Sequence, residues 1–247
     1  FITRSEKQEA RFGEMTAEQF RRQQESILAK LKGRSVRDGP ALLEAPFDMA
    51  AWVKRFREAG RPVLREIVQE VGTEAIADLG LSLAFNVSNP AVVRFLEGRA
   101  QRFAREVNKT TWDKLKASLA EGLDAGETTD QLAARVENVM GDRIASSKEA
   151  IARTEVTGAN SGGDLLAWRQ AEEDTGPLVK AWLAALDDRT RDTHVIAHNR
   201  YNLEGGAIPL AEDFQVGDGS GPGPGQIDDV AEVVNCRCTM TVHPAKR

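Results

Sequence analysis

The chain has 247 residues, and its 33 basic and 38 acidic side chains give a formal net charge of −5. This balance excludes a protein that coats nucleic acid with its whole surface, although a local basic face is compatible with it. No run of eighteen apolar residues occurs, so no membrane-spanning helix is predicted.

The N-terminal part of the chain is predicted to be helical. A first helix is expected over residues 16–32, where Thr16 and Gln19 have the spacing of a capping box and apolar residues follow at a helical period. Glycines and prolines within residues 33–46 predict a linker. The chain opens on Phe1 rather than methionine, so we expect a piece of a longer polypeptide or a processed form.

The apolar stripes of the first two helical regions, 16–32 and 47–71, are separated by this linker. We do not expect them to be buried against one another alone. Apolar faces of this size on a monomer usually mark a contact with another protein. The first sixty or so residues are therefore predicted to extend away from the C-terminal part and contact another chain.

Local signals divide the middle of the chain into several helices. Pro62 is expected to open a helix, and Gly72 is expected to interrupt it. Asn89 followed by Pro90 predicts a clear helix start, with asparagine as the N-cap. Gly141 is expected to end a later helix before a long one over residues 145–171.

The long helix that begins at Pro90 is basic within an acidic protein. Four of its side chains are predicted to form a DNA-binding face, namely Arg99, Arg102, Arg105 and Lys109. A solvated polar face, or a surface for an acidic partner, is the more common explanation of such a pattern.

The composition changes after Gly176, and two strands are expected, one over Lys180–Leu186 and one over Val233–Val242. The glycine- and proline-rich segment 217–225 is expected to form neither helix nor regular strand and to be ordered against a partner chain. It lacks the lysine of a phosphate-binding P-loop. The predicted class is α+β, a predominantly helical N-terminal region followed by a small mixed α/β C-terminal domain with an antiparallel sheet. The predicted divisions are 1–46, the N-terminal helix and linker; 47–144, a helical domain; and 145–247, the C-terminal domain.

The densest polar cluster follows the first of these strands. It comprises Asp187, Arg189, Thr190, Arg191 and His194. A catalytic interpretation makes His194 a general base, Asp187 its orienting partner and Arg191 an anion clamp. No nucleophile appears in a recognisable context, so a structural network of ion pairs and turn-capping hydrogen bonds is favoured.

The two cysteines of the chain, Cys236 and Cys238, suggest a metal site. Residues two apart on a strand face the same side, so both sulfurs could bind one ion together with His194. We therefore predict that these three side chains converge. A closed zinc site needs four ligands, so Asp188 or His198 would have to complete it. The alternative is that both cysteines are small buried apolar residues, and the prediction for cofactors is either none or one structural zinc ion. Cysteines so close in sequence are a poor disulfide pair, which favours a reducing compartment.

Three short motifs occur in a characteristic order: Ile151-Ala-Arg153-Thr154-Glu155, then Asp187-x-Arg189-Thr190-Arg191-x-x-His194, then Asn235-Cys236-Arg237-Cys238. Together they resemble the phage Mu F-like minor head proteins, the phage head morphogenesis family. Some relatives in this family have further cysteines where this chain has Asp187 and His194.

The resemblance implies a structural component inside the head of a tailed phage, assembled in the host cytoplasm. Its implied partners are the portal protein and other copies in the head, with packaged DNA as a further partner and no membrane. The implied role is in head morphogenesis, DNA packaging or DNA delivery. The alternative is an enzyme carried in the head, a metal-assisted nuclease or an ADP-ribosyltransferase-like protein. Arg153 and Glu155 would be the residues that serve an ADP-ribosyltransferase activity. As a structural pair, at least one of them is expected to contact the 187–191 segment or Arg237.

Overall fold

The computed structural model describes residues 2–32, 34, 47–204 and 206–245. Most of the predicted linker, Gly33 and residues 35–46, lies outside the described residues. Among the described residues, no helix has both the length and the apolar character needed to cross a bilayer.

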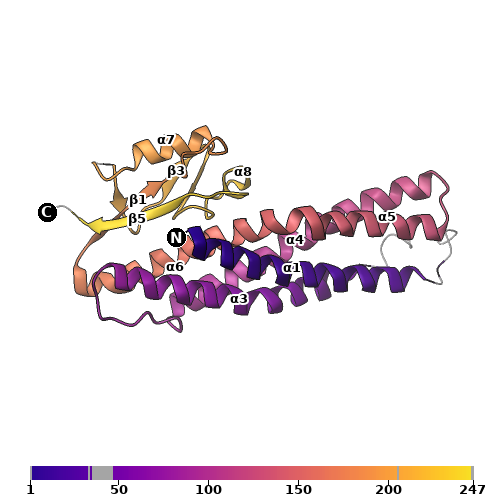
Figure 1. The fold of residues 1–247 in the computed structure, drawn as a ribbon, viewed down its shortest axis with the longest axis horizontal. Coiled ribbons are helices and arrows are strands. Elements are labelled where there is room, and N and C mark those ends of the chain that lie inside the picture. Colours follow the sequence, from indigo (N-terminus) through magenta and orange to yellow (C-terminus); the bar gives the residue numbers. More distant parts are fainter. Residues whose placement is uncertain (1, 33, 35–46, 205, 246–247) are drawn as a thin grey trace. The chain divides into compact units, whose positions relative to one another are not determined.

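Long helices precede a small sheet, so the predicted α+β class is confirmed (Figure 1). The helices are α1 (Ile2–Leu31), α3 (Met49–Asp78), α4 (Pro90–Asp124), α5 (Thr129–Asp142), the π-helix η2 (Arg143–Ser147) and α6 (Lys148–Thr175). They are followed by β1 (Leu178–Leu183), α7 (Asp192–Arg200), β2 (Ile208–Pro209), β3 (Phe214–Val216), β4 (Gly219–Gly221), α8 (Val230–Val233) and β5 (Thr239–Pro244).

The chain forms two compact units, each described by itself. The sheet unit comprises Phe1–Glu9, Val63–Glu97 and Ala150–Arg247, and the helical unit comprises Ala10–Pro62 and Gly98–Glu149. The predicted domain boundaries at residues 46 and 144 divide the chain into continuous segments, whereas each compact unit is made of separate segments. These boundaries stay a prediction.

Aromatic side chains from three helices form the core of the helical unit. The Phe12 and Phe103 rings lie 5.0 Å apart, and those of Phe20 and Phe56 lie 5.4 Å apart. All four are at most 1% exposed. As predicted, the stripes of α1 and α3 are not buried against one another alone, because Phe103 of α4 completes their core. The expectation that they are left exposed for another chain to cover is wrong, and contact of this region with another chain stays a prediction.

Several predicted helix boundaries are wrong because packing overrides the local signal. Pro62 lies inside α3, and α3 also continues through Gly72 to Asp78. A Cβ at Gly72 would lie 2.5 Å from the Phe85 ring, so this glycine admits a neighbouring side chain rather than ending the helix. The end predicted at Gly141 is confirmed for α5, which ends at Asp142, although η2 then joins α5 to α6 without a break in the helical run. The start of α4 is confirmed: Asn89 Oδ1 accepts a hydrogen bond from the Ala91 backbone N–H at 2.9 Å.

The three-stranded sheet of the sheet unit is antiparallel, as predicted, with the strand order β2-β1-β5. Its strands β1 and β5 are labelled in Figure 1. Trp182 on β1 pairs with Met240 on β5. The expectation that residues 217–225 contain no strand is wrong, because β4 pairs with β3 in a hairpin. A Cβ at Gly221 would lie 2.2 Å from the Gln226 carbonyl oxygen, so glycine permits a close backbone approach there.

Helix α6 is the central helix of the sheet unit and is buried on several sides. A Cβ at Gly162 would lie 2.1 Å from the Phe95 ring, and one at Gly163 would lie 3.3 Å from Val71. One turn earlier in α6, the backbone of Gly225 approaches Gly158, and a Cβ at Gly225 would lie 2.7 Å from the Gly158 nitrogen. The small residues of α6 therefore let neighbouring elements approach it closely, and this places the motif-bearing turns against it.

Candidate functional site

Asp187 organises the turn that follows β1. Its carboxylate accepts hydrogen bonds from the Arg189 backbone N–H at 3.1 Å and from the Thr190 hydroxyl at 3.0 Å. It also binds the Arg237 guanidinium in a two-pronged contact, with Nη2 to Oδ1 at 2.7 Å. The Arg237 hydrogen bond is the main reason that the pKa of Asp187 is held well below its usual range. Asp187 and its partners therefore form the kind of network, made of ion pairs and turn-capping hydrogen bonds, that the sequence favours for this segment.

The motif residues of α6 contact the segment that precedes β5. Arg153 Nη1 donates to Asn235 Oδ1 at 3.0 Å, and the Asn235 backbone N–H donates to Thr154 Oγ1 at 3.0 Å. Thr157 Oγ1 donates to the Cys236 carbonyl oxygen at 2.7 Å. Asn235 has a φ of 61°, a left-handed conformation that asparagine tolerates better than most residues.

The expected docking of the 153–155 segment is therefore confirmed, although the partners of Arg153 differ from those predicted. Arg153 contacts Asn235 and, through Nε at 3.4 Å, the Glu9 carboxylate, rather than Arg237 or the 187–191 segment. Glu155 is half-buried on the same helix. Arg191 also contacts the segment before β5, because its Nη2 donates to the Val234 carbonyl oxygen at 2.6 Å. The three sequence motifs thus meet at residues 234–238.

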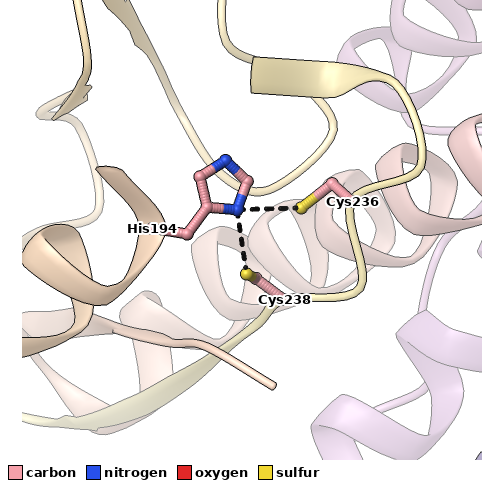
Figure 2. A group of neighbouring side chains, drawn as sticks. All are labelled: His194, Cys236 and Cys238. Atoms are coloured by element: carbon pink, nitrogen blue, oxygen red, sulfur yellow. Dashed lines mark hydrogen bonds between the residues drawn. The ribbon is translucent and has the colours of Figure 1, made fainter. Parts of the chain in front are cut away.

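His194, Cys236 and Cys238 converge, as predicted from their spacing. His194 Nδ1 lies 3.2 Å from Cys238 Sγ and 3.7 Å from Cys236 Sγ (Figure 2). The three side chains are buried, and their candidate ligand atoms all lie within 4.8 Å of one another. Hydrogen bonds from Cys236 and His194 lower the pKa of Cys238 to about 5, whereas the contact with Cys238 and burial raise the pKa of Cys236.

The two residues expected to complete a zinc site lie elsewhere. The Asp188 side chain is 93% exposed and lies 4.0 Å from Arg189. His198 Nδ1 lies 3.2 Å from the Trp182 carbonyl oxygen. Among the described residues, the candidate ligand group comprises His194, Cys236 and Cys238.

Glu232 is the site residue that sequence reasoning missed. Its Oε2 lies 3.0 Å from His194 Nε2, an ion-pair distance without the alignment of a good hydrogen bond. The catalytic interpretation, in which Asp187 orients His194, is therefore wrong: Asp187 binds Arg237, and the carboxylate beside His194 is Glu232. No local signal distinguishes Glu232 among the 38 acidic residues of the chain.

A cavity of about 530 Å³ lies beside this cluster in the sheet unit. Its wall includes Cys238, the paired Arg237 and Asp187, and Arg153. Carboxylates accompany the arginines around it, so the cavity does not concentrate charge of one sign.

The basic surface predicted on α4 belongs to the helical unit. Arg99 is only 3% exposed, so its assignment to an exposed DNA-binding face is wrong. Arg102, Arg105 and Lys109 are exposed, and Lys109 Nζ lies 2.8 Å from Asp113 Oδ2. DNA binding by these three side chains stays a prediction.

Comparison with known proteins gives a family match. The model of the family described as "Phage Mu protein F like protein" matches residues 113–241, slightly more than half of the chain. All three motifs lie inside this range. No solved structure matches the chain.

Two curated proteins are similar to parts of the chain. Minor head protein GP7 of Bacillus phage SPP1 is 33% identical over 129 residues, 52% of this chain and 39% of GP7. A protein named NAD(+)--arginine ADP-ribosyltransferase EFV, from Enterococcus faecalis (strain ATCC 700802 / V583), is 29% identical over 155 residues, 62% of this chain and 29% of EFV. The chain thus spans well under half the length of either relative.

Proposed function

Because the chain belongs to the family of proteins like phage Mu protein F, we propose that it is a structural component of a tailed-phage head that associates with the portal during head morphogenesis. Its proposed place is the interior of the head, after assembly in the host cytoplasm, and its proposed partners are the portal and other copies of itself. Roles in DNA packaging or delivery are part of the same proposal.

The observation that best supports this proposal is that the family match covers all three motifs, and these motifs form one structural clamp. Asp187 binds Arg237, Arg191 binds the carbonyl of residue 234, and Arg153 binds Asn235. Each charged group is engaged in holding the backbone of residues 234–238 in place. Polar residues that are bound to one another stabilise the fold of the segment they hold, and a stable fold suits a structural component of an assembly.

An enzymatic role has less support. The name of EFV describes an ADP-ribosyltransferase, but the chain spans only 29% of that protein. A nuclease in which Asp187 orients His194 requires a pair that the structure does not form. A catalytic proposal would have to use the Glu232–His194 contact instead.

The proposal is tested in purified phage particles that encode this chain. Quantitative immunoblotting of density-purified particles is expected to detect the chain at a fixed ratio to the portal protein. Protease treatment should leave it intact in closed heads and degrade it after the heads are opened. Absence from particles, or degradation in closed heads, would contradict the proposed location.

Portal association is tested by co-expression with the portal protein of the same phage. Arg237→Ala removes both contacts with the Asp187 carboxylate, and we expect it to reduce co-purification with the portal several-fold. Arg94→Ala is the matched control, because Arg94 is an exposed arginine outside the three motifs. Equal co-purification of the wild type and both variants would mean that the clamp does not support portal binding, and no co-purification of the wild type would contradict the association itself.

A further inference from the structure

The His194 ring is held between two different chemical environments. Nδ1 faces two sulfur atoms, at 3.2 Å and 3.7 Å (Figure 2), and Nε2 faces the Glu232 carboxylate at 3.0 Å. The ring is 2% exposed, so water does not compete for either nitrogen. In the tautomer with the proton on Nε2, on the side of the Glu232 carboxylate, the Nδ1 lone pair is directed at the sulfurs, and this is the tautomer that a metal ion bound between them requires.

The spacing of the three facing atoms suits one metal ion. Ligand atoms bound at about 2.0–2.3 Å to a tetrahedral zinc ion lie roughly 3.5 Å from one another. The observed nitrogen–sulfur separations of 3.2 Å and 3.7 Å bracket that value. Two thiolates with one imidazole are a donor set that zinc-class ions prefer.

The surroundings of Glu232 fix its carboxylate in place. Thr193 Oγ1 donates to Oε2 at 2.8 Å, so the residue before His194 in sequence holds the same oxygen that faces the ring. A Cβ at Gly217 would lie 2.5 Å from Oε1, and Gly217 has a φ of 59°, so a glycine makes room for the carboxylate there. Glu232 itself is 7% exposed. A buried carboxylate is unfavourable unless it has partners, and here those partners include the imidazole.

We propose that His194 Nδ1, Cys236 Sγ and Cys238 Sγ bind one zinc-class ion, and that Glu232 is a positioning residue that orients the His194 ring for it. The described residues supply three ligands, which leaves one position of a tetrahedral ion for a ligand from outside this group. This site is independent of the head-assembly role: it assigns a cofactor and a supporting residue, whatever the partners of the chain are.

The metal is tested first, on the purified full chain. After Zn²⁺ loading and removal of excess metal, elemental analysis should give about one zinc per chain. Cys238→Ser and His194→Ala should lose it, and His198→Ala on the same helix should keep it. A wild-type chain that retains no zinc, or a His194→Ala variant that retains all of it, would overturn the metal site.

The role of Glu232 is tested by titration with Co²⁺, whose absorption bands report thiolate ligands. Glu232→Ala should weaken Co²⁺ binding by about 10–100-fold, with unchanged thiolate bands. Glu232→Gln retains a side-chain oxygen that can accept a hydrogen bond and should recover part of the affinity. If both variants bind Co²⁺ as tightly as the wild type, the positioning role is wrong while the metal site stands.

Urea unfolding of the metal-free proteins separates positioning from a merely structural role. A structural Glu232 would lower the stability of the metal-free chain and leave the affinity of the folded protein unchanged. Our proposal requires the opposite pattern, in which affinity falls more than stability. A Glu232→Ala chain that does not fold leaves the decision to Glu232→Gln, for which an affinity equal to that of the wild type would again contradict the proposal.

Discussion

Asp164 on α6 is a buried carboxyl in the sheet unit, 9% exposed. Burial raises its pKa to about 7, the Arg4 charge opposes that shift, and Asp78 adds to it. The folded chain therefore holds a proton that the unfolded chain releases as the pH rises above about 4. The contribution of this proton to the free energy of unfolding is fully present below that pH and is lost as the pH rises through about 7. A shift of about three pKa units corresponds to about 4 kcal/mol at most.

Asp164→Asn is thus expected to be more stable than the wild type at pH 8, and the difference should shrink at pH 5. Urea unfolding at the two pH values measures this. The matched control is Asp174→Asn on an exposed turn of the same helix, which should follow the pH dependence of the wild type. A pH dependence of the Asp164→Asn chain equal to that of the wild type would show that Asp164 does not titrate as its burial implies.

Individual residues also mark the limit of prediction from this sequence. The convergence of His194, Cys236 and Cys238 could be predicted because their chemistry is rare in the chain and each lies close to one of two neighbouring strands. The strands themselves do not carry them, since His194 lies on α7 and both cysteines precede β5. Glu232 and Asp164 could not be predicted, because glutamate and aspartate are common and nothing local to either residue predicts that it is buried. Burial of one carboxylate among 38 acidic residues depends on tertiary packing alone.

At the scale of elements, local sequence signals predict some helix boundaries and not others, since the start at Asn89-Pro90 is confirmed and the one at Pro62 is wrong. The Asn89-Pro90 start was correct because an N-cap acts through its own neighbouring backbone groups. The prediction of a helix end at Gly72 is wrong, whereas α5 does end beside Gly141, at Asp142, before η2 continues the helical run. A glycine within a helix can instead admit a distant side chain, as Phe85 does at Gly72, and the sequence does not show that contact.

Two helix glycines make a matched test of this distinction. Gly162 in α6 faces the Phe95 ring, which a Cβ would approach to 2.1 Å, whereas a Cβ at Gly98 in α4 would meet nothing within 4 Å. Gly162→Ala should destabilise the chain by about 1–3 kcal/mol through overpacking. Gly98→Ala should stabilise it by up to about 1 kcal/mol, because alanine favours the helix. Denaturant unfolding measures both, and effects of the same sign would contradict the packing argument.

For the whole molecule, the prediction that failed was that the N-terminal sixty residues need another chain to cover them. The α1 and α3 stripes were compared only with each other, since they are neighbours in sequence. The structure adds α4, whose Phe103 ring lies 5.0 Å from Phe12 and 6.0 Å from Phe56. Phe103, which lies more than forty residues after Phe56 in sequence, completes the core of the helical unit, and no periodic pattern in α1 or α3 indicates which helix supplies it.

The helical unit should therefore unfold as one cooperative body in the isolated chain. Hydrogen exchange is expected to protect residues 10–31 of α1 as strongly as residues 98–124 of α4, because each buries its apolar face against the other's side chains. Phe20 is 0% exposed, with the Phe56 ring at 5.4 Å and the Arg143 guanidinium over its own ring at 5.0 Å. Phe20→Ala should lower the protection of both segments together, by about 3–5 kcal/mol. Arg22→Ala, at a side chain that is 59% exposed, should leave both nearly unchanged. Rapid exchange of α1 beside a protected α4 in the wild type would show that the N-terminal helix is not part of this core, and would restore the view that another chain must cover it.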